Sequence, residues 1–325
     1  MVLVQTPLRV SFVGGGTDFK EYYARRDGSV ISAAIDKYVY VMVKKRFDDD
    51  IRAVYSKTEM VKSVDDIRHD LIREALRKTG VEKGVEIATF ADIPSEGCGL
   101  GSSSAITIGL LNALHAYTGV RKTSEELAQE ACDIEIDILK RPIGKQDQYI
   151  AAYGGIKHIV FKVNDTVQVN HLDLTGPSVK LLEQRLLLLY TGMTRKSSEI
   201  LTEQKEKMGE HFTMLDKMNG LVPQLKESML NGIGTEFGRL LDKNWRLKKQ
   251  LASKISNSDI DTCYERTLQA GAVGGKICGA GGGGFLLLYC TPEKRGAVTE
   301  AAKPMREVKF RFEKCGSIVL LDVRP

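Results

Sequence analysis

The sequence predicts an α+β protein of two domains, and three observations lead to this prediction. The chain has 325 residues, more than one small hydrophobic core usually organises, so two domains are the natural expectation. In the first half, a strand expected at 85–93 leads into a loop of glycine and serine and then into an apolar helix. In the second half, the order strand, helices, strand, helix, strand is typical of a split βαβ sandwich. We expect a first domain over residues 1–176 and a second over residues 177–325.

Composition is that of an ordinary globular protein, with 42% hydrophobic and 27% charged residues. The apolar run at residues 186–190 is far too short to span a bilayer, and the N-terminus lacks the basic and apolar regions of a secretion signal. We therefore expect a cytoplasmic protein that does not bind membranes. The six cysteines are scattered without a CxxC pair, which favours reduced thiols over a disulfide framework or a zinc site.

The formal net charge of +5 comes from lysines and arginines that are interleaved with acidic residues. Such a distribution gives little support to a nucleic-acid-binding face, whereas a small anionic substrate needs only a few local charges. Charge thus favours a small-molecule partner over a nucleic acid, and the sequence leaves open whether the chain forms a homo-oligomer.

The N-terminal segment is expected to form a strand over residues 3–13, in which Pro7 marks an edge or a bulge. The three glycines at 14–16 then turn the chain into a short helix over 18–26 and leave room for a pocket floor. Asp18 either accepts hydrogen bonds from ligand hydroxyls or caps this helix, and its spacing does not separate the two roles.

Four further elements are expected before the loop of glycine and serine. They are two strands within 29–47 on either side of Asp36 and Lys37, a third strand at 51–55, and an amphipathic helix at 64–78.

The loop itself has the features of a phosphate site. Its glycines can adopt positive φ and let the backbone approach a ligand, while its serines fall in the first turn of the next helix, where N–H groups point outward. The positive end of the helix dipole adds to this attraction, and the hydroxyls can serve a metal or a phosphate oxygen. The alternative is a flexible loop with a serine cap, but the strand before it and the helix after it favour phosphate binding. The residues concerned are Gly97, Gly99, Leu100, Gly101, Ser102, Ser103 and Ser104.

Two better-known phosphate motifs do not fit. A Walker A loop would need a glycine where Ala270 stands and a serine or threonine where Ile277 follows Lys276. A dinucleotide fingerprint fails because Phe19 occupies the position of its last glycine.

Glu135 is the first candidate for a metal ligand. A capping box, Thr123-Ser-Glu-Glu126, begins a helix whose apolar residues continue past this position, although residues 133–138 also alternate as a strand would. Glu135 lies beside the buried stripe of that helix, where a carboxylate needs a cation, and Mg²⁺ is the obvious one if phosphates lie nearby.

Asp147 is the first candidate for a catalytic carboxylate. Pro142 ends the preceding helix, and Gly144 indicates a loop that presents Asp147 at the head of a new short helix. The charged form of an acid is favoured there, which suits a base or a group that orients a hydroxyl; capping of the helix explains Asp147 equally well. Strands at 155–162 and 166–173 are expected to complete the first domain.

The second domain is expected to begin with a buried strand and to contain a second glycine-rich loop. The expected elements are a strand at 181–191, a long helix after residue 198, helices at 235–252 and 258–272, a loop at 274–284, a strand at 285–290, a helix at 293–304, and strands near 308–312 and 316–322. So many glycines at 274–284 let the loop press against another loop or a ligand, or act as a hinge.

Three motifs in this order resemble those of the GHMP kinases, the family that includes galactokinase, homoserine kinase, mevalonate kinase and phosphomevalonate kinase. Residues 7–19 look like the first motif, 94–105 like the ATP loop and 276–285 like the third, glycine-rich motif. The resemblance implies a first domain similar to domain 2 of ribosomal protein S5 and a ferredoxin-like second domain. It also implies ATP and Mg²⁺ as cofactors.

The resemblance also implies roles for single residues. Ser103 and Glu135 match the metal ligands of the family, and Asp147 matches the aspartate beside the attacking hydroxyl. Arg9 matches the arginine next to that aspartate, and Asp18 matches the sugar-binding aspartate of galactokinase. The residues implied to bind substrate are Gly15, Gly16, Thr17, Asp18, Arg195, Gly281 and Gly282.

The glycines at positions 15 and 16 replace the Glu-His of galactokinase, which favours a larger or differently hydroxylated sugar. The motifs together are most similar to those of bacterial D-glycero-D-manno-heptose 7-phosphate kinases, followed by fucose kinases. This similarity implies phosphorylation of an anomeric hydroxyl, here to a heptose 1,7-bisphosphate for surface polysaccharide. A non-catalytic sugar sensor with the same fold is the competing class, and it is disfavoured because Arg9, Ser103, Glu135 and Asp147 are all present.

A phosphorylated sugar needs a cation for its own phosphate. Arg195 is the basic residue expected to supply it, since its planar fork suits bidentate contact with phosphate, with Lys196 assisting. A solvent-facing arginine at the start of a helix is the alternative.

Overall fold

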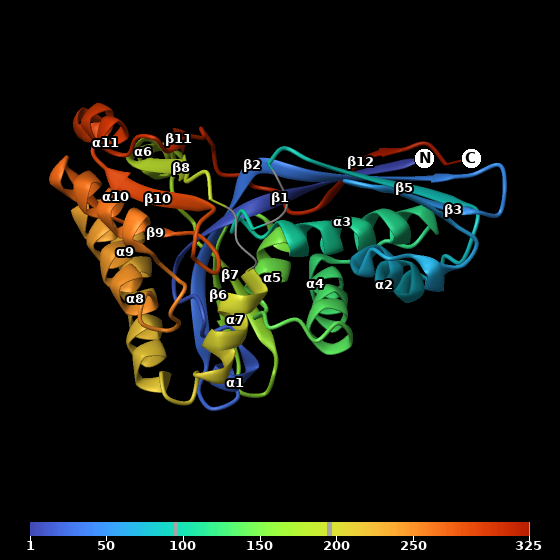
Figure 1. Ribbon diagram of the computed structural model, residues 1–325, viewed down its shortest axis with the longest axis horizontal. Helices are drawn as coiled ribbons and strands as arrows, with labels where there is room; N and C mark the ends of the chain where they lie inside the picture. The colour runs from blue at the N-terminus through green and yellow to red at the C-terminus, as the bar shows by residue number, and fades with distance from the viewer. Residues whose placement is uncertain (94–96, 194–196, 325) are drawn as a thin grey trace.

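The computed structural model describes residues 1–93, 97–193 and 197–324 and consists of two sheets with helices packed on them (Figure 1). The first sheet has eight strands in the order β12-β1-β2-β5-β3-β4, with β6 paired to β2 and β7 paired to β6. Its strands are β1 (Val2–Val13), β2 (Gly28–Lys45), β3 (Ile51–Val54), β4 (Thr58–Val61), β5 (Val85–Ala91), β6 (Ile156–Phe161), β7 (Val167–His171) and β12 (Ile318–Asp322).

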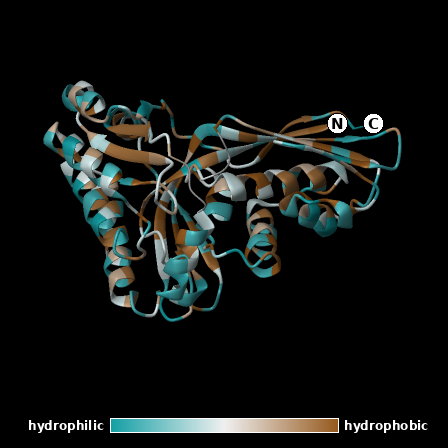
Figure 2. Cartoon of the chain, viewed as in Figure 1, coloured by the Kyte–Doolittle hydropathy of each residue, from teal (hydrophilic) through white to brown (hydrophobic). Residues whose placement is uncertain are grey.

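The helices of the first half are α1 (Lys20–Tyr23), the 3₁₀-helix η1 (Val64–Asp66), α2 (Asp70–Thr79), α3 (Ser102–Tyr117), α4 (Ser124–Cys132), the π-helix η2 (Asp133–Ile138) and α5 (Gln146–Tyr153). Of these, α2, α3, α4 and α5 lie together under one face of the sheet (Figure 1). The helix α3 contacts β1, β2 and each of α2, α4 and α5, so it is buried over most of its surface. Figure 2 shows it as a largely hydrophobic helix, as a central helix must be.

The second sheet has four antiparallel strands in the order β11-β8-β10-β9. They are β8 (Leu186–Tyr190), β9 (Ala272–Ile277), β10 (Phe285–Cys290) and β11 (Arg306–Glu307). Numbered along the chain, this order is 4-1-3-2, which is the ferredoxin-like arrangement expected from the sequence. Its helices are α6 (Gly176–Arg185), α7 (Ser197–Glu206), α8 (Phe212–Leu230), α9 (Thr235–Lys248), α10 (Ser258–Gln269), η3 (Pro292–Lys294) and α11 (Arg295–Ala301).

The two halves share a hydrophobic core. Helices α8 and α9 contact β1, and one continuous cluster of buried side chains includes residues from both halves, such as Phe12 and Phe237, whose rings meet edge to face. The boundary expected at residue 177 coincides with α6, but β12 returns to pair with β1 of the first sheet. The C-terminal strand of the chain therefore belongs to the sheet of the first half. No helix in the described part of the chain is long and apolar enough to cross a bilayer.

The predictions of two strands around Asp36 and Lys37 and of a helix over residues 18–26 were wrong. A single strand, β2, replaces the two strands expected around Asp36 and Lys37. These two residues form a bulge, because Pro7 pairs with Tyr38 and the next residue of β1, Leu8, pairs with Ile35. The backbone N–H of Asp36 donates to the carbonyl oxygen of Arg311, and its carboxylate accepts from the Arg311 N–H and pairs with Lys37. A polar pair that resembles a turn therefore stays inside the strand. Pro7 marks this bulge, and β1 is not an edge strand. The helix expected at 18–26 is limited to α1.

In the second half, the strand expected from residue 181 begins only at Leu186, since α6 continues to Arg185. The Thr175 side chain caps α6 and Pro177 occupies its first turn, and both signals outweigh the apolar run that follows. Strand β9 was expected to be a loop because of its glycines. Gly274 lies against the backbone of Gly238 in α9, where a Cβ would come within 2.0 Å of the Gly238 carbonyl oxygen, so glycine permits close packing of helix on strand.

Candidate active site

The expected ATP loop lies between β5 and α3 and packs against the second glycine-rich loop. Gly97, Gly99 and Gly101 adopt φ of +65°, +76° and +78°, which are conformations that side chains rarely tolerate. A Cβ on Gly99 would lie 2.5 Å from the carbonyl oxygen of Cys278, and a Cβ on Gly279 would lie 2.6 Å from the Cα of Gly99. The two loops therefore touch backbone to backbone, and each requires glycine at the contact.

The three serines at the start of α3 have different partners. Ser102 Oγ lies 3.0 Å from the sulfur of Cys98, and Ser104 Oγ donates to Glu135 at 2.8 Å. Ser103 is exposed and accepts a hydrogen bond from Arg141, whose other nitrogen pairs with both oxygens of Asp70. Of the three hydroxyls, that of Ser103 is the one that faces outward at the N-terminus of the helix.

Glu135 lies in the π-helix that follows α4 and is fully buried. Its carboxylate accepts hydrogen bonds from Ser104, Thr107 and Gln148. Burial raises the pKa of Glu135, and the hydrogen bonds from Thr107 and Ser104 oppose this rise. A nearby cation would stabilise the charged carboxylate further.

Asp147 forms a bidentate ion pair with Arg9. The Nε and Nη2 atoms of Arg9 each donate to one oxygen of Asp147 at 2.7 Å, and the Nη1 atom donates to the Gly99 carbonyl oxygen at 2.6 Å. Arg9 thus ties the carboxylate to the glycine and serine loop. Asp147 lies in the first turn of α5 and does not cap it, since Lys145 is the N-cap residue. Capping as the sole role of Asp147 is therefore wrong.

Asp18 does not cap a helix either. Its carboxylate accepts hydrogen bonds from the backbone N–H of Gly16 at 2.9 Å, and from the backbone and side-chain N–H of Gln146. Burial raises the pKa of Asp18, and the bond from Gly16 opposes this rise. Gly144 is required beside it, because a Cβ there would lie 2.1 Å from an Asp18 oxygen. Through its hydrogen bonds, Asp18 links the glycine turn at residues 14–16 to the start of α5, the helix that contains Asp147.

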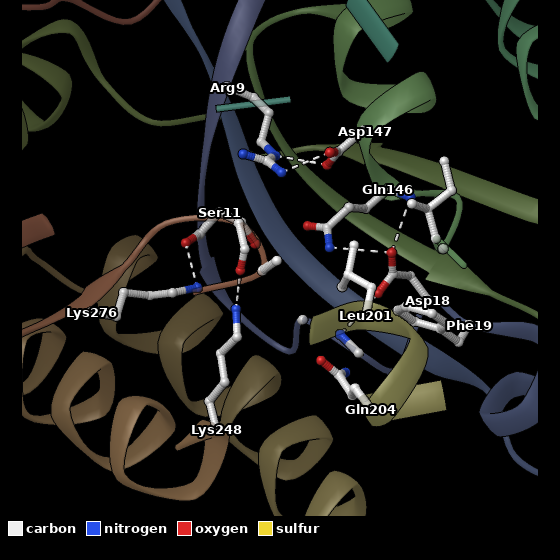
Figure 3. A pocket seen from close by; sticks show the side chains of 16 residues that line it. Arg9, Ser11, Asp18, Phe19, Gln146, Asp147, Leu201, Gln204, Lys248 and Lys276 are labelled. Carbon is white, nitrogen blue, oxygen red and sulfur yellow. Dashed lines mark hydrogen bonds and ion pairs between the residues drawn. The ribbon is translucent and has the colours of Figure 1, made fainter. Parts of the chain in front are cut away.

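Two adjoining hollows meet at Arg9 and Asp147. We call the first the loop hollow. It is lined by the glycines and serines of the loop at residues 97–104, by Glu135 and by Arg141. The hollow that we call the inner hollow is shown in Figure 3 and is lined by polar side chains that include Ser11, Asp18, Gln146, Gln204, Lys248 and Lys276. Both hollows include Arg9, Ile143, Asp147, Leu201, Gly279 and Ala280.

The structure brings most of the expected site residues to these hollows, and the exceptions among the described residues are Leu100, Thr17, Gly281 and Gly282. The side chain of Leu100 is fully buried in the hydrophobic core, and only its carbonyl oxygen is used, as acceptor from the backbone N–H of Arg9 at 2.9 Å. Thr17 is fully buried, and its hydroxyl donates to the carbonyl oxygens of Gly14 and Ser29, so it fixes the turn and does not face a ligand. Gly281 and Gly282 pack against Ile255, and their neighbours Gly279 and Ala280 line both hollows instead. Arg195 lies outside the described residues.

Two functional candidates were missed from the sequence, Lys248 and Lys276, which both point into the inner hollow (Figure 3). Lys276 lies within the third motif, between Gly275 and Ile277, and a lysine in such an apolar, glycine-rich stretch is a signal of a buried cation. Lys248 ends α9 in a run of lysines, and nothing in its sequence context distinguishes it from Lys249.

Comparison with known proteins assigns the chain to a family. Residues 67–155 match the GHMP kinases N-terminal domain, and residues 225–307 match the GHMP kinases C-terminal domain. A D-glycero-alpha-D-manno-heptose 7-phosphate kinase from Campylobacter jejuni is 30% identical over 317 residues, which are 93% of each chain. An L-fucokinase/L-fucose-1-P guanylyltransferase from Bacteroides fragilis is 27% identical and covers 87% of this chain, which spans 34% of that protein.

Solved structures of GHMP kinases resemble this chain as well. A crystal structure of a D-glycero-D-manno-heptose 1-phosphate kinase from Bacteroides thetaiotaomicron superposes with a TM-score of 0.83 over the whole of both chains, at 25% identity. Galactokinase from Lactococcus lactis, solved with galactose, gives a TM-score of 0.77 at 19% identity over 98% of this chain and 95% of that chain, and so shows the fold alone.

The fold and the hollows around Arg9 and Asp147 define a two-domain small-molecule kinase. The chain belongs to the GHMP kinases. It is therefore a phosphotransferase with an alcohol group as acceptor and ATP as donor, and its similarity to heptose and fucose kinases places it among the sugar kinases of the family.

Proposed function

We propose that the enzyme transfers the γ-phosphoryl group of ATP to the anomeric hydroxyl of D-glycero-D-manno-heptose 7-phosphate, giving the 1,7-bisphosphate. The observation that carries the proposal is the Arg9–Asp147 pair, which stands where a loop suited to phosphates meets a polar hollow. Two of its relatives act, by their names, on a heptose phosphate. In this role the enzyme would act in the cytoplasm and help to supply the nucleotide-activated heptose from which surface polysaccharide is made.

In this proposal the nucleotide occupies the loop hollow and the sugar occupies the inner hollow. The N–H groups of the loop and of the first turn of α3 hold phosphate oxygens. Asp147 accepts the hydrogen bond or the proton of the attacking hydroxyl, and Arg9 keeps both carboxylate oxygens in place. Positioning of this kind supplies much of the rate of phosphoryl transfer.

The residues of the loop hollow fit a Mg²⁺ ion that is shared with phosphates. Among residues 1–93, 97–193 and 197–324, no three His, Cys, Asp or Glu side chains gather closely enough to enclose a metal. Mg²⁺ typically needs only one or two carboxylates when phosphates and water fill its other positions. Glu135 and the hydroxyl of Ser103 line the loop hollow and are the proposed ligands. When bound, the ion would neutralise charge on the phosphates.

The inner hollow suits a ligand with many hydroxyl groups. The Ser11 hydroxyl and the side-chain amide oxygen of Gln146 are buried and have no hydrogen-bond partner in the described part of the chain. Asp18 adds a carboxylate, and Gly15 and Gly16 line the same space without side chains. Such groups are left unpaired at a cost unless a ligand reaches them. An L-fucose or other hexose 1-kinase is the second candidate, because a fucokinase is among the similar proteins.

A coupled assay of ADP release against a panel of sugars tests the proposed function. The panel contains heptose 7-phosphate, fucose, galactose and mannose, with and without Mg²⁺. We expect turnover to be highest with heptose 7-phosphate and to require the metal. Preference for fucose would favour the second candidate, and no ADP release with any sugar would favour a sugar-sensing protein.

Replacement of either proposed metal ligand should raise the Mg²⁺ concentration needed for half-maximal activity. We expect an increase of about tenfold or more for Glu135→Gln and a smaller one for Ser103→Ala, since a carboxylate is the stronger ligand. Glu130→Gln is the matched control, because Glu130 accepts hydrogen bonds outside both hollows. Unchanged Mg²⁺ titrations for both variants would show that the metal is held elsewhere.

A further inference from the structure

The inner hollow contains two lysines that no carboxylate neutralises. Lys248, the last residue of α9, and Lys276, in β9, are 5% and 1% exposed. Lys248 donates to the carbonyl oxygen of Gly279, and Lys276 donates to that of Ser11 at 2.8 Å (Figure 3). Within the described residues, neither lysine forms an ion pair. Each ammonium group has three donor hydrogens, so two on each remain for a ligand.

Two unpaired buried cations are costly in the absence of an anion. Burial, together with the charge of Arg9, lowers the pKa of Lys248 to about 8. Burial also places the pKa of Lys276 well below its ordinary value, and the charge of Lys248 adds to the effect. Asp18, a candidate counter-ion in the same hollow, directs its oxygens to Gly16 and Gln146. An anionic ligand would favour the charged state of both lysines.

The position of the lysines indicates which ligand carries that anion. Both line the inner hollow, and neither lines the loop hollow with its glycines, serines and Glu135. The Arg9–Asp147 pair lines both hollows and so marks where they adjoin. A negative group at the lysines therefore belongs to the acceptor and not to the nucleotide.

We propose that Lys248 and Lys276 form a subsite for a phosphate monoester on the acceptor, remote from the hydroxyl that is phosphorylated. The proposal rests on the proposed function and adds the residues that would select a phosphorylated sugar. A phosphate monoester carries close to two negative charges and three acceptor oxygens at neutral pH, which matches two ammonium groups with two free donors each. The subsite differs from the Arg195 assignment made from the sequence.

The test compares Lys248→Met and Lys276→Met with the wild type on heptose 7-phosphate and on the same heptose without its phosphate. Methionine keeps most of the side-chain volume and removes the charge, so folding should survive, and thermal melting checks this. Lys249→Met is the matched control, because Lys249 is the next residue and pairs with Asp261. We expect each lysine variant to lower the ratio of kcat/KM for the phosphorylated sugar to that for the free sugar by about 10- to 100-fold. The KM for ATP should stay within about twofold.

A binding experiment separates this subsite from the proposed function. With ADP and Mg²⁺ saturating the nucleotide site, inorganic phosphate is titrated into each protein in a calorimeter. Phosphate binding that weakens at least tenfold in both lysine variants supports the subsite, even if the wild type phosphorylates no heptose and the proposed function fails. An equal loss for both sugars, or phosphate binding that the lysine variants retain, overturns the proposal. Loss of discrimination in Arg195→Ala alone overturns it as well and returns the role to Arg195.

Discussion

Replacing Asp147 with asparagine is expected to lower kcat by about two orders of magnitude or more. The substitution keeps the size of the side chain but removes the charge that Arg9 pairs with and the ability to accept a proton. Arg9 would still find one oxygen acceptor and the Gly99 carbonyl oxygen, so the fold should persist with some loss of stability. Steady-state kinetics, nucleotide binding by calorimetry and thermal melting measure the three effects separately.

Asp165→Asn is the control for this variant. Asp165 is also paired with a basic residue, Lys145, but it lies outside both hollows. We expect its kcat to stay within a few fold of the wild type. A loss of less than tenfold in Asp147→Asn would limit Asp147 to orienting the acceptor, and a protein that no longer folds would assign it a structural role.

The second large effect is expected for Gly279→Ala, which should lower kcat/KM for ATP by about 100-fold. The Cβ would lie 2.6 Å from the Cα and 2.7 Å from the carbonyl oxygen of Gly99, and backbone atoms cannot rotate away as a side chain can. The ATP loop must shift to relieve this contact, and small displacements of a positioning element are costly in rate.

Gly80→Ala separates the clash from the backbone strain. Gly80 has φ of +68°, close to the +65° of Gly279, but nothing lies within 4 Å of its added Cβ. Both variants should lose about 1–2 kcal/mol of stability from the left-handed conformation. Only Gly279→Ala should lose activity with ATP. Equal kinetics for the two variants would show that the contact between the loops does not position the nucleotide.

Much of the fold could be predicted because local signals and tertiary structure agree. The capping box at Thr123 does begin α4, and the glycine and serine loop does connect β5 to the central helix α3. Predictions failed where a tertiary contact decides a local conformation. Asp36 and Lys37 have the composition of a turn, yet their bonds with Arg311 and with each other hold them in a bulge. No pattern along the chain reveals a partner 275 residues away.

The site residues likewise divide into those that local sequence patterns reveal and those that only tertiary packing reveals. Arg9, Asp18, Glu135 and Asp147 were expected from motifs, and the structure places all four at the two hollows. Thr17 belongs to the same motif but faces the backbone of its own turn, because a hydroxyl can serve a turn as readily as a ligand. Lys248 was missed because burial alone distinguishes it from the lysine that follows, and burial is set by the packing of α9 on β9.

The structure of the product shows whether the enzyme phosphorylates the anomeric hydroxyl of a sugar, as we propose. Purified enzyme is incubated with ATP, Mg²⁺ and heptose 7-phosphate, and the product is analysed by phosphorus NMR with proton coupling. We expect a second phosphomonoester signal that is coupled to the anomeric proton, formed in equal amount with ADP. A new phosphate on any other carbon, or ADP without a phosphorylated sugar, would contradict the proposed function.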